Sequence, residues 1–250
     1  TDALKNLNVE LLSGTGPDVI LLDGMDASVY SGKGMLADLS PVLKGLVDQQ
    51  AVFENIASAY KQENGTFVIP ASFSLPLLFG RQEDVEAVKD MDSLAAVVEK
   101  LRQENPEGSI TGAFSARQEL LQLMEVNSVG WLDGKELDTQ AVSNFLNQAL
   151  RIYKADMQGV SKEELEVWGE TERAWSLGGL AALTAGDKIK IMAGTASNML
   201  MDMGAVSKVM DEQGYVFDLW PGEEGTGYLP MDKLAVSASS TQQEQAVNFV

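Results

Sequence analysis

The sequence predicts an α/β protein built from two lobes. Its 250 residues exceed one average domain, taken as roughly 100–200 residues, and fall short of two large ones. Short apolar runs bounded by turn residues alternate with stretches of helical periodicity, which is the pattern of strands and helices in turn. With 45% hydrophobic and 22% charged residues, the chain has the composition of a globular protein with a buried core.

A helix and a strand are predicted at the start of the chain. Leu4, Leu7 and Leu11 recur at helical spacing within residues 1–13. The apolar run over residues 19–22 lies between a Gly-Pro-Asp turn and an Asp-Gly turn. Such a run is typical of a strand buried on both faces of a parallel sheet.

The alternation continues along the chain. Helical periodicity predicts helices over residues 94–101 and 139–153, each preceded by Asp-Ser or Asp-Thr, residues that cap helices. Further strands are expected around residues 67–69, 189–193, 216–220 and 234–237. A last helix begins near Ser240 and Thr241 and is cut by the end of the sequence. We therefore expect a fragment with elements missing at both ends.

The charge balance argues against nucleic-acid partners. The chain has 18 basic and 37 acidic residues, a formal net charge of −19 and a pI near 4.3. The electric field of so negatively charged a protein repels nucleic acids and anionic lipids over a distance of about one Debye length. No apolar run approaches the roughly 20 residues of a membrane-spanning helix.

Two residue types are absent from the sequence. Without histidine or cysteine, the chain has no imidazole base, no thiolate nucleophile and no Cys-ligated zinc. These absences indicate a protein that binds without chemistry and needs no cofactor. A glycosidase that uses only a pair of carboxylates remains an open alternative.

Five segments in a fixed order carry a family resemblance. SGTGPDVI (residues 13–20) and YSGKGMLADLSP (30–41) resemble the first strand motif and the following segment of family 1 extracellular solute-binding proteins. NGTFVIP (64–70) resembles the strand that leads into that family's interlobe hinge, and GDKIKIM (186–192) resembles a later strand. LAVSASSTQQEQAVNF (234–249) resembles its closing strand and helix. The resemblance covers nearly the whole chain.

This resemblance implies a periplasmic-binding-protein-like type II fold, in which two α/β lobes with a cleft are joined by a multi-strand hinge. The first lobe is expected to comprise residues 1–72 and 219–250, and the second lobe residues 73–218. The implied function is that of a receptor of a bacterial ABC importer, a monomer that closes over a small-molecule ligand, expected to be an oligosaccharide, and delivers it to permease subunits. The implied location is the outer face of the cell membrane, as a lipoprotein, or the periplasm. The family's N-terminal strands, its lipoprotein cysteine and its C-terminal helices fall outside these residues.

The first candidate ligand contacts follow the strand over residues 19–22. Ligands of open α/β sheets bind beyond the carboxyl ends of strands, which indicates Asp23 and Asp26. Their carboxylates can accept hydrogen bonds from sugar hydroxyls. An equally good interpretation of Asp26 is a helix N-cap.

Further candidates follow the hinge and the second-lobe strands. The resemblance places Phe73 and Ser74 at the hinge, with core packing as the alternative for the aromatic ring. Phe114 and Arg117 would face the ligand from the second lobe, although an arginine in so acidic a chain is also a natural surface ion-pair partner. Asn198 follows the strand near residue 191, where it binds ligand or caps a helix.

Tryptophans are the natural platforms for a sugar ring, whose apolar face stacks on an aromatic side chain. Trp220 ends a predicted strand before Pro-Gly, and Tyr228 follows in the next glycine-rich loop. We expect both to contact ligand. Trp131, beside a predicted turn, is expected only to cover that turn.

Two alternatives to an importer receptor stay open. A partner of a membrane kinase that senses ligand shares the same fold, and sequence cannot separate it from an importer receptor. A glycosidase needs two carboxyls roughly 5–10 Å apart, and no pair of acidic residues stands out from the background.

Overall fold

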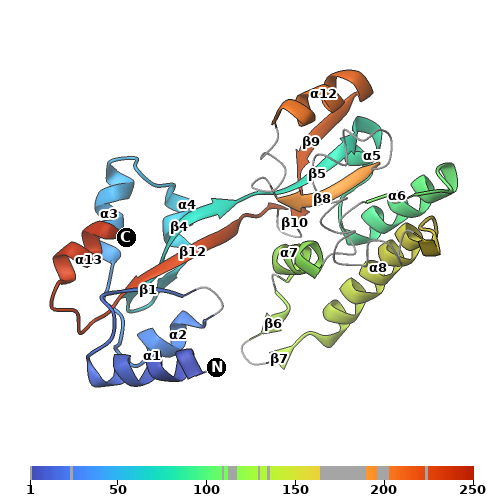
Figure 1. Ribbon diagram of the computed structural model, residues 1–250. Coiled ribbons are helices and arrows are strands. Elements are labelled where there is room, and N and C mark those ends of the chain that lie inside the picture. The colour runs from blue at the N-terminus through green and yellow to red at the C-terminus, as the bar shows by residue number, and fades with distance from the viewer. Residues whose placement is uncertain are drawn as a thin grey trace. The chain divides into compact units, whose positions relative to one another are not determined.

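The chain forms two compact α/β units (Figure 1). The computed structural model describes residues 2–22, 25–108, 110–111, 117–128, 130–133, 136–163, 190–195, 203–222 and 225–250. Unit 1 comprises Thr1–Phe73 and Pro230–Val250, and unit 2 comprises Ser74–Leu229. The chain therefore passes between the units twice, at 73/74 and at 229/230.

The second passage lies later than the expected boundary at 218/219. Strand β9 (Tyr215–Leu219) pairs along its whole length with β5 (Pro76–Arg81), and the Trp220 N–H donates to the Pro76 carbonyl. These backbone hydrogen bonds hold residues 215–220 in unit 2. A short hairpin of β10 (Pro221–Gly222) and β11 (Gly225–Thr226) follows before the chain leaves.

Unit 1 is built on a three-stranded sheet in the order β1-β12-β4. Its strands are β1 (Val19–Leu21), β12 (Leu229–Val236) and β4 (Ile69–Ser74). A two-stranded hairpin, β2 (Lys61–Gln62) and β3 (Gly65–Thr66), precedes β4. The helices are α1 (Asp2–Ser13), α2 (Ala27–Ser31), α3 (Ser40–Asp48), α4 (Glu54–Ser58) and α13 (Gln243–Phe249).

The expectation of a parallel, doubly buried strand at residues 19–22 is wrong for the described part of the chain. β1 pairs antiparallel with β12, with Val19 opposite Val236 and Leu21 opposite Leu234. Ile20 is buried, but the Leu21 side chain is 54% exposed. A short apolar run does not reveal how many strands flank it, and among the described residues only β12 pairs with β1.

Unit 2 contains a three-stranded antiparallel sheet in the order β8-β5-β9, with β8 spanning Ile191–Thr195. Its helices are α5 (Gln82–Ala87), α6 (Met91–Glu104), α7 (Arg117–Asn127), α8 (Thr139–Met157) and α12 (Met203–Gln213). A hairpin of β6 (Leu132–Asp133) and β7 (Glu136–Leu137) joins α7 to α8. Within this unit α6 and α8 pack side by side (Figure 1).

The two longest helices of unit 2 form for reasons visible in the sequence. Asp90 caps α6 in a capping box with Ser93, and Asp138 caps α8 by accepting from the N–H groups of Gln140 and Ala141. The apolar stripe of α6 and that of α8 are buried in one cluster with β5, as the periodicity predicted. Among the described residues no helix is both long and apolar enough to cross a membrane.

A buried polar network fixes the segment between α6 and residue 111. The Asp156 carboxylate, fully buried, accepts from the N–H groups of Ile110 (2.5 Å) and Thr111 (2.9 Å). The Arg102 guanidinium, 6% exposed, donates to the carbonyls of Ala155, Asp156, Asn105 and Gly108 at 2.6–2.7 Å. These bonds join the C-terminal end of α8 to the loop that follows α6.

We predict that Asp156→Ala destabilises unit 2 by about 2–4 kcal/mol, because two buried N–H groups lose their acceptor. Denaturant unfolding followed by circular dichroism measures the change. The control is Lys154→Ala, an exposed position on the same helix, which should change the free energy of unfolding by less than about 0.5 kcal/mol. Equal stability of the two variants would contradict the structural role of Asp156.

Substitutions at Gly159 and Gly45 provide a second test of the packing, with one crowded and one open position. A Cβ at Gly159 would collide with the Arg102 guanidinium and the Gly108 carbonyl, whereas a Cβ at Gly45 within α3 would meet nothing within 4 Å. We expect Gly159→Ala to lower the melting temperature, because the Arg102 network must shift. Gly45→Ala should stabilise by about 0.5–1 kcal/mol through helix propensity. Thermal unfolding of both variants checks the opposite signs.

Candidate ligand-binding site

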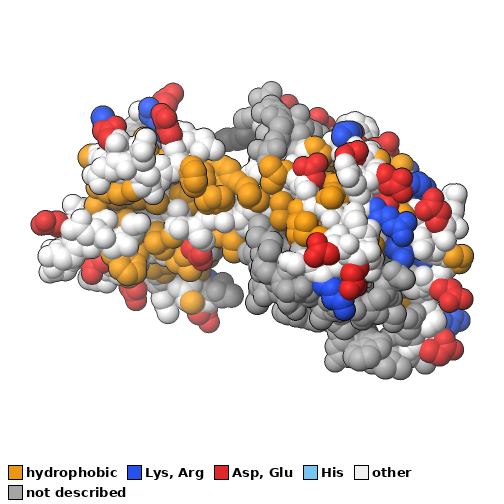
Figure 2. Space-filling model, turned by 90° about the horizontal axis from the view of Figure 1, so that it is seen from above, with side chains coloured by type: hydrophobic (Ala, Val, Ile, Leu, Met, Phe, Trp, Pro, Cys, Tyr) orange, Lys and Arg blue, Asp and Glu red, His pale blue; other side chains and the backbone are white. Residues whose placement is uncertain are grey.

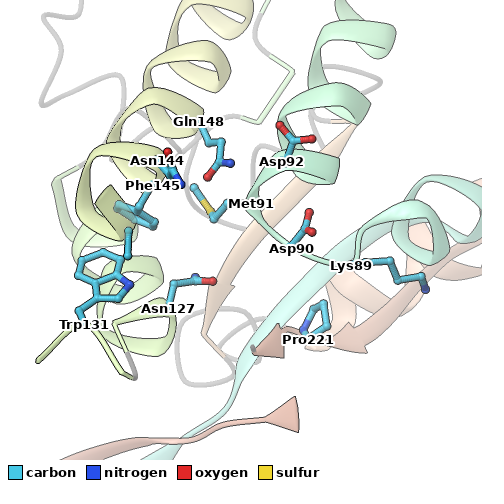
Figure 3. Close-up of a pocket in the computed structure, with 11 residues that line it drawn as sticks. Lys89, Asp90, Met91, Asp92, Asn127, Trp131, Asn144, Phe145, Gln148 and Pro221 are labelled. Carbon is cyan, nitrogen blue, oxygen red and sulfur yellow. The ribbon is translucent and has the colours of Figure 1, made fainter. Parts of the chain in front are cut away.

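A cavity of about 230 Å³ opens within unit 2, between the N-terminus of α6, the first half of α8 and the segment that follows α7 (Figure 3). Carboxamides and aromatic rings dominate its lining. The residues that define its chemistry are Asp90, Met91, Asn127, Trp131, Asn144 and Gln148. All of them belong to unit 2.

The α6 side of the pocket carries two carboxylates that already have partners. Oδ1 of Asp90 accepts from the Ser93 N–H (2.8 Å) and from the Ser93 hydroxyl (2.7 Å), and these bonds lower the pKa of Asp90. Asp92 accepts from Arg151 at 2.6 Å. The same guanidinium binds Glu99 through two nitrogens, which lowers the pKa of Glu99. Both carboxylates at the pocket thus already accept hydrogen bonds from the protein itself.

The α8 side of the pocket is a row of carboxamides. Gln140, Asn144 and Gln148 recur every four residues and so lie on one helix face. Gln140 donates to the Asn144 carboxamide oxygen at 2.8 Å. Gln148 makes no hydrogen bond to any described residue, so both ends of its carboxamide are free.

The remaining wall comes from the end of α7 and the turn after it. Asn127 is 6% exposed, and its Nδ2 donates to the Leu123 carbonyl at 2.7 Å. Its carboxamide oxygen is directed toward the cavity in Figure 3. The Trp131 ring meets Phe145 edge to face, with centroids 5.3 Å apart. The expectation that Trp131 only covers a turn is therefore incomplete, because it also lines the pocket.

This pocket is equipped for hydrogen bonding. Neutral carboxamides offer donors and acceptors together, and its two carboxylates are occupied by a cap and an ion pair. Among the described residues no group of three or more acidic side chains is placed to hold a metal ion. Across the face shown in Figure 2, acidic side chains lie scattered and do not gather in one patch.

Four of the predicted ligand contacts have side chains that lie outside the described part of the structure. Asp23, Phe114 and Asn198 lie outside the described residues. Arg117 is the first residue of α7, and its side chain also lies outside the described part.

Asp26 takes the helix-capping role that the sequence left open. Its Oδ1 accepts from the Ser28 N–H at 2.9 Å and from the Ser28 hydroxyl at 2.7 Å. These hydrogen bonds lower the pKa of Asp26. The carboxylate is exposed at the start of α2 in unit 1.

Phe73 and Ser74 differ in exposure although they are neighbours. The Phe73 ring is 40% exposed and meets the 65% exposed Phe53 edge to face at 5.9 Å, so it is not the packed core aromatic of the alternative interpretation. Ser74, the first residue of unit 2, is 3% exposed.

Trp220 requires a correction. The sequence suggested an exposed stacking platform, but its side chain is 0% exposed in the core of unit 2. The ring is enclosed because its backbone pairs with Pro76 in the sheet and because Leu229 packs in the same cluster. Its indole Nε1 has no hydrogen-bond partner among the described residues. Tyr228 is half-buried, and burial raises the pKa of its hydroxyl.

The pocket residues Asn127, Asn144 and Gln148 were missed by the sequence reasoning. The sequence did contain a signal for Asn144 and Gln148, because carboxamides at four-residue intervals lie on one face of a predicted helix. No pattern links Asn127 or Trp131 to that face, because the turn after α7 brings them there.

Comparison with solved structures supports the fold. A solute-binding protein of an ABC transporter from Thermotoga lettingae, bound with α-D-tagatose, is 17% identical over 98% of this chain and 64% of that chain, with a TM-score of 0.56. The GacH receptor of Streptomyces glaucescens, described in complex with acarbose, is 14% identical over 99% of this chain and 64% of its own, with a TM-score of 0.56. A sugar transporter from Arthrobacter chlorophenolicus with bound laminaribiose is 17% identical over 99% and 64%, with a TM-score of 0.53.

These neighbours share the fold of periplasmic solute-binding proteins, so the predicted fold class is confirmed. The chain spans about 64% of the length of each of the three. No curated protein matches the sequence significantly. The family model described as bacterial extracellular solute-binding protein matches residues 1–250. Because the match covers the whole chain, the protein belongs to the bacterial extracellular solute-binding proteins, the type of family that its sequence motifs resemble.

Proposed function

We propose that the chain is the ligand-binding part of an ABC importer receptor and that its ligand is a sugar or short oligosaccharide. The observation that carries the proposal is the shared fold of three neighbours with tagatose, acarbose and laminaribiose as ligands. Two α/β units linked by two chain passages suit a receptor that closes over its ligand.

We infer that binding is not followed by catalysis. The sequence has neither histidine nor cysteine, and the two carboxylates at the unit 2 pocket are held in a helix cap and an ion pair. A glycosidase of the retaining or inverting type needs one carboxyl free to act as acid. Sugar recovered unchanged after incubation is the expected result.

Ligand contacts within this proposal come from both units. Phe73 is the stacking candidate of unit 1, because its ring is partly exposed beside Phe53. Tyr228, which is half-buried, is the accessible polar candidate of unit 2. Ser74 and Trp220 belong to the proposed set but are buried, at 3% and 0% exposed. Asp23, Asp26, Phe114, Arg117 and Asn198 complete the proposed set.

The family also suggests where the protein works. Its members are bacterial extracellular proteins. We propose attachment to the outer face of the membrane as a lipoprotein, and delivery of ligand by a monomer to ABC permease subunits. The acidic surface agrees with this location, since it does not favour nucleic-acid or anionic lipid partners.

We predict that one of tagatose, raffinose or laminaribiose raises the melting temperature of the 250-residue chain. A ligand at a hundred times its Kd adds about 2.7 kcal/mol to the folded state, and each kcal/mol shifts the melting temperature of a chain this long by about 2–4 °C. Differential scanning fluorimetry with the three sugars measures the shift. The matched variant is Phe73→Ala, which should reduce the shift if the ring stacks on the sugar.

Two outcomes would count against this proposal. A melting temperature that rises with a peptide or polyamine, and with no sugar, would remove the carbohydrate assignment. Cleavage of the oligosaccharides, followed by chromatography, would remove the binding-only function as well.

A further inference from the structure

We propose that the unit 2 pocket is itself a binding site for one ring of a neutral polyhydroxylated molecule. The inference goes beyond the proposed function, because every lining residue lies in Ser74–Leu229 and the site requires no residue of unit 1. It rests on four properties of the pocket, namely its unused hydrogen-bonding groups, its charge, its size and its aromatic wall.

Unused hydrogen-bonding capacity converges on the cavity from three directions. The Asn127 carboxamide oxygen and the Trp131 indole nitrogen face it from one side in Figure 3, and neither bonds a described residue. From α8 come the Asn144 carboxamide nitrogen and both ends of the Gln148 carboxamide, which are likewise unbonded within the described residues. Asn127 is buried, Gln148 is partly buried and Asn144 is exposed, so these groups are accessible to a ligand that carries both donors and acceptors.

The charge at the pocket disfavours anions, because Asp90 and Asp92 line it. One oxygen of each carboxylate is already engaged, since Oδ1 of Asp90 accepts twice from Ser93 and Oδ1 of Asp92 accepts from Arg151, which weakens their attraction for a cation. The Lys89 side chain points away from the cavity in Figure 3. Hydroxyl groups, which both donate and accept, match the neutral carboxamides that remain.

The size of the cavity limits the ligand. Pockets for drug-sized molecules span about 300–1,000 Å³. At about 230 Å³, this cavity suits one ring and not an oligosaccharide. Trp131, 8% exposed, and Phe145, 3% exposed, are in edge-to-face contact and give the cavity an apolar floor through the small part of each ring that stays accessible.

Proton–nitrogen NMR of the 250-residue chain tests the inference. The probe is D-tagatose, and the reporter is the indole N–H resonance of Trp131, assigned by its loss in Trp131→Phe. We expect tagatose to move this resonance in a saturable way. Gln148→Ala should weaken the binding about tenfold, which is the value of roughly one good hydrogen bond. Ala141→Leu, which fills the cavity without removing a polar group, should abolish it.

Controls separate the pocket from the receptor function. Asn147→Ala, exposed on the same helix and absent from the pocket lining, should leave the titration unchanged. If oligosaccharides raise the melting temperature while tagatose does not move the Trp131 resonance, the pocket inference fails and the proposed function stands. The inference also fails if Gln148→Ala and Ala141→Leu bind like the parent chain. Movement with the diamine putrescine, and not with tagatose, would replace the neutral ligand by a cation.

Discussion

The packing of α6 against α8 is the constraint on which unit 2 depends. Two of the pocket's walls belong to these helices, and two sets of hydrogen bonds join the pair. Arg151 of α8 binds Asp92 and Glu99 of α6. Arg102 of α6 donates to the Ala155 and Asp156 carbonyls at the C-terminal end of α8. Apolar side chains buried between the two helices supply most of the stability of this packing, because the exposed ion pairs of Arg151 are worth at most about 1 kcal/mol each.

Hydrogen bonds also engage one oxygen of each pocket carboxylate, that of Asp90 through Ser93 and that of Asp92 through Arg151. Among the described residues, the carboxamides of Gln140, Asn144 and Gln148 on α8 make no hydrogen bond apart from the one between Gln140 and Asn144. The pocket therefore combines neutral carboxamides with two carboxylates and Lys89. The neutral carboxamides suit recognition of uncharged hydroxyl groups.

Capping and periodicity predicted the main helices well, because both are local properties. The stripe over residues 94–101 lies within α6, and the pattern over 139–153 lies within α8. The strand near residues 216–220 lies within a residue of β9. Local sequence patterns gave a wrong prediction where the structure depends on contacts with residues distant in the chain. The run at residues 19–22 had the composition of a doubly flanked strand, yet Leu21 is half exposed beside a single partner.

The sequence by itself determined the class of protein, because ordered motifs over 250 residues indicate an extracellular solute-binding protein. Only the tertiary structure decided which side chains are available. Trp220 carries a polar indole nitrogen and stands next to a predicted turn in the sequence, but its side chain is enclosed in the core. Asn127 and Trp131, by contrast, join Asn144 and Gln148 at one cavity. Exposure and convergence are set by contacts between elements far apart in the chain, and no local pattern encodes them.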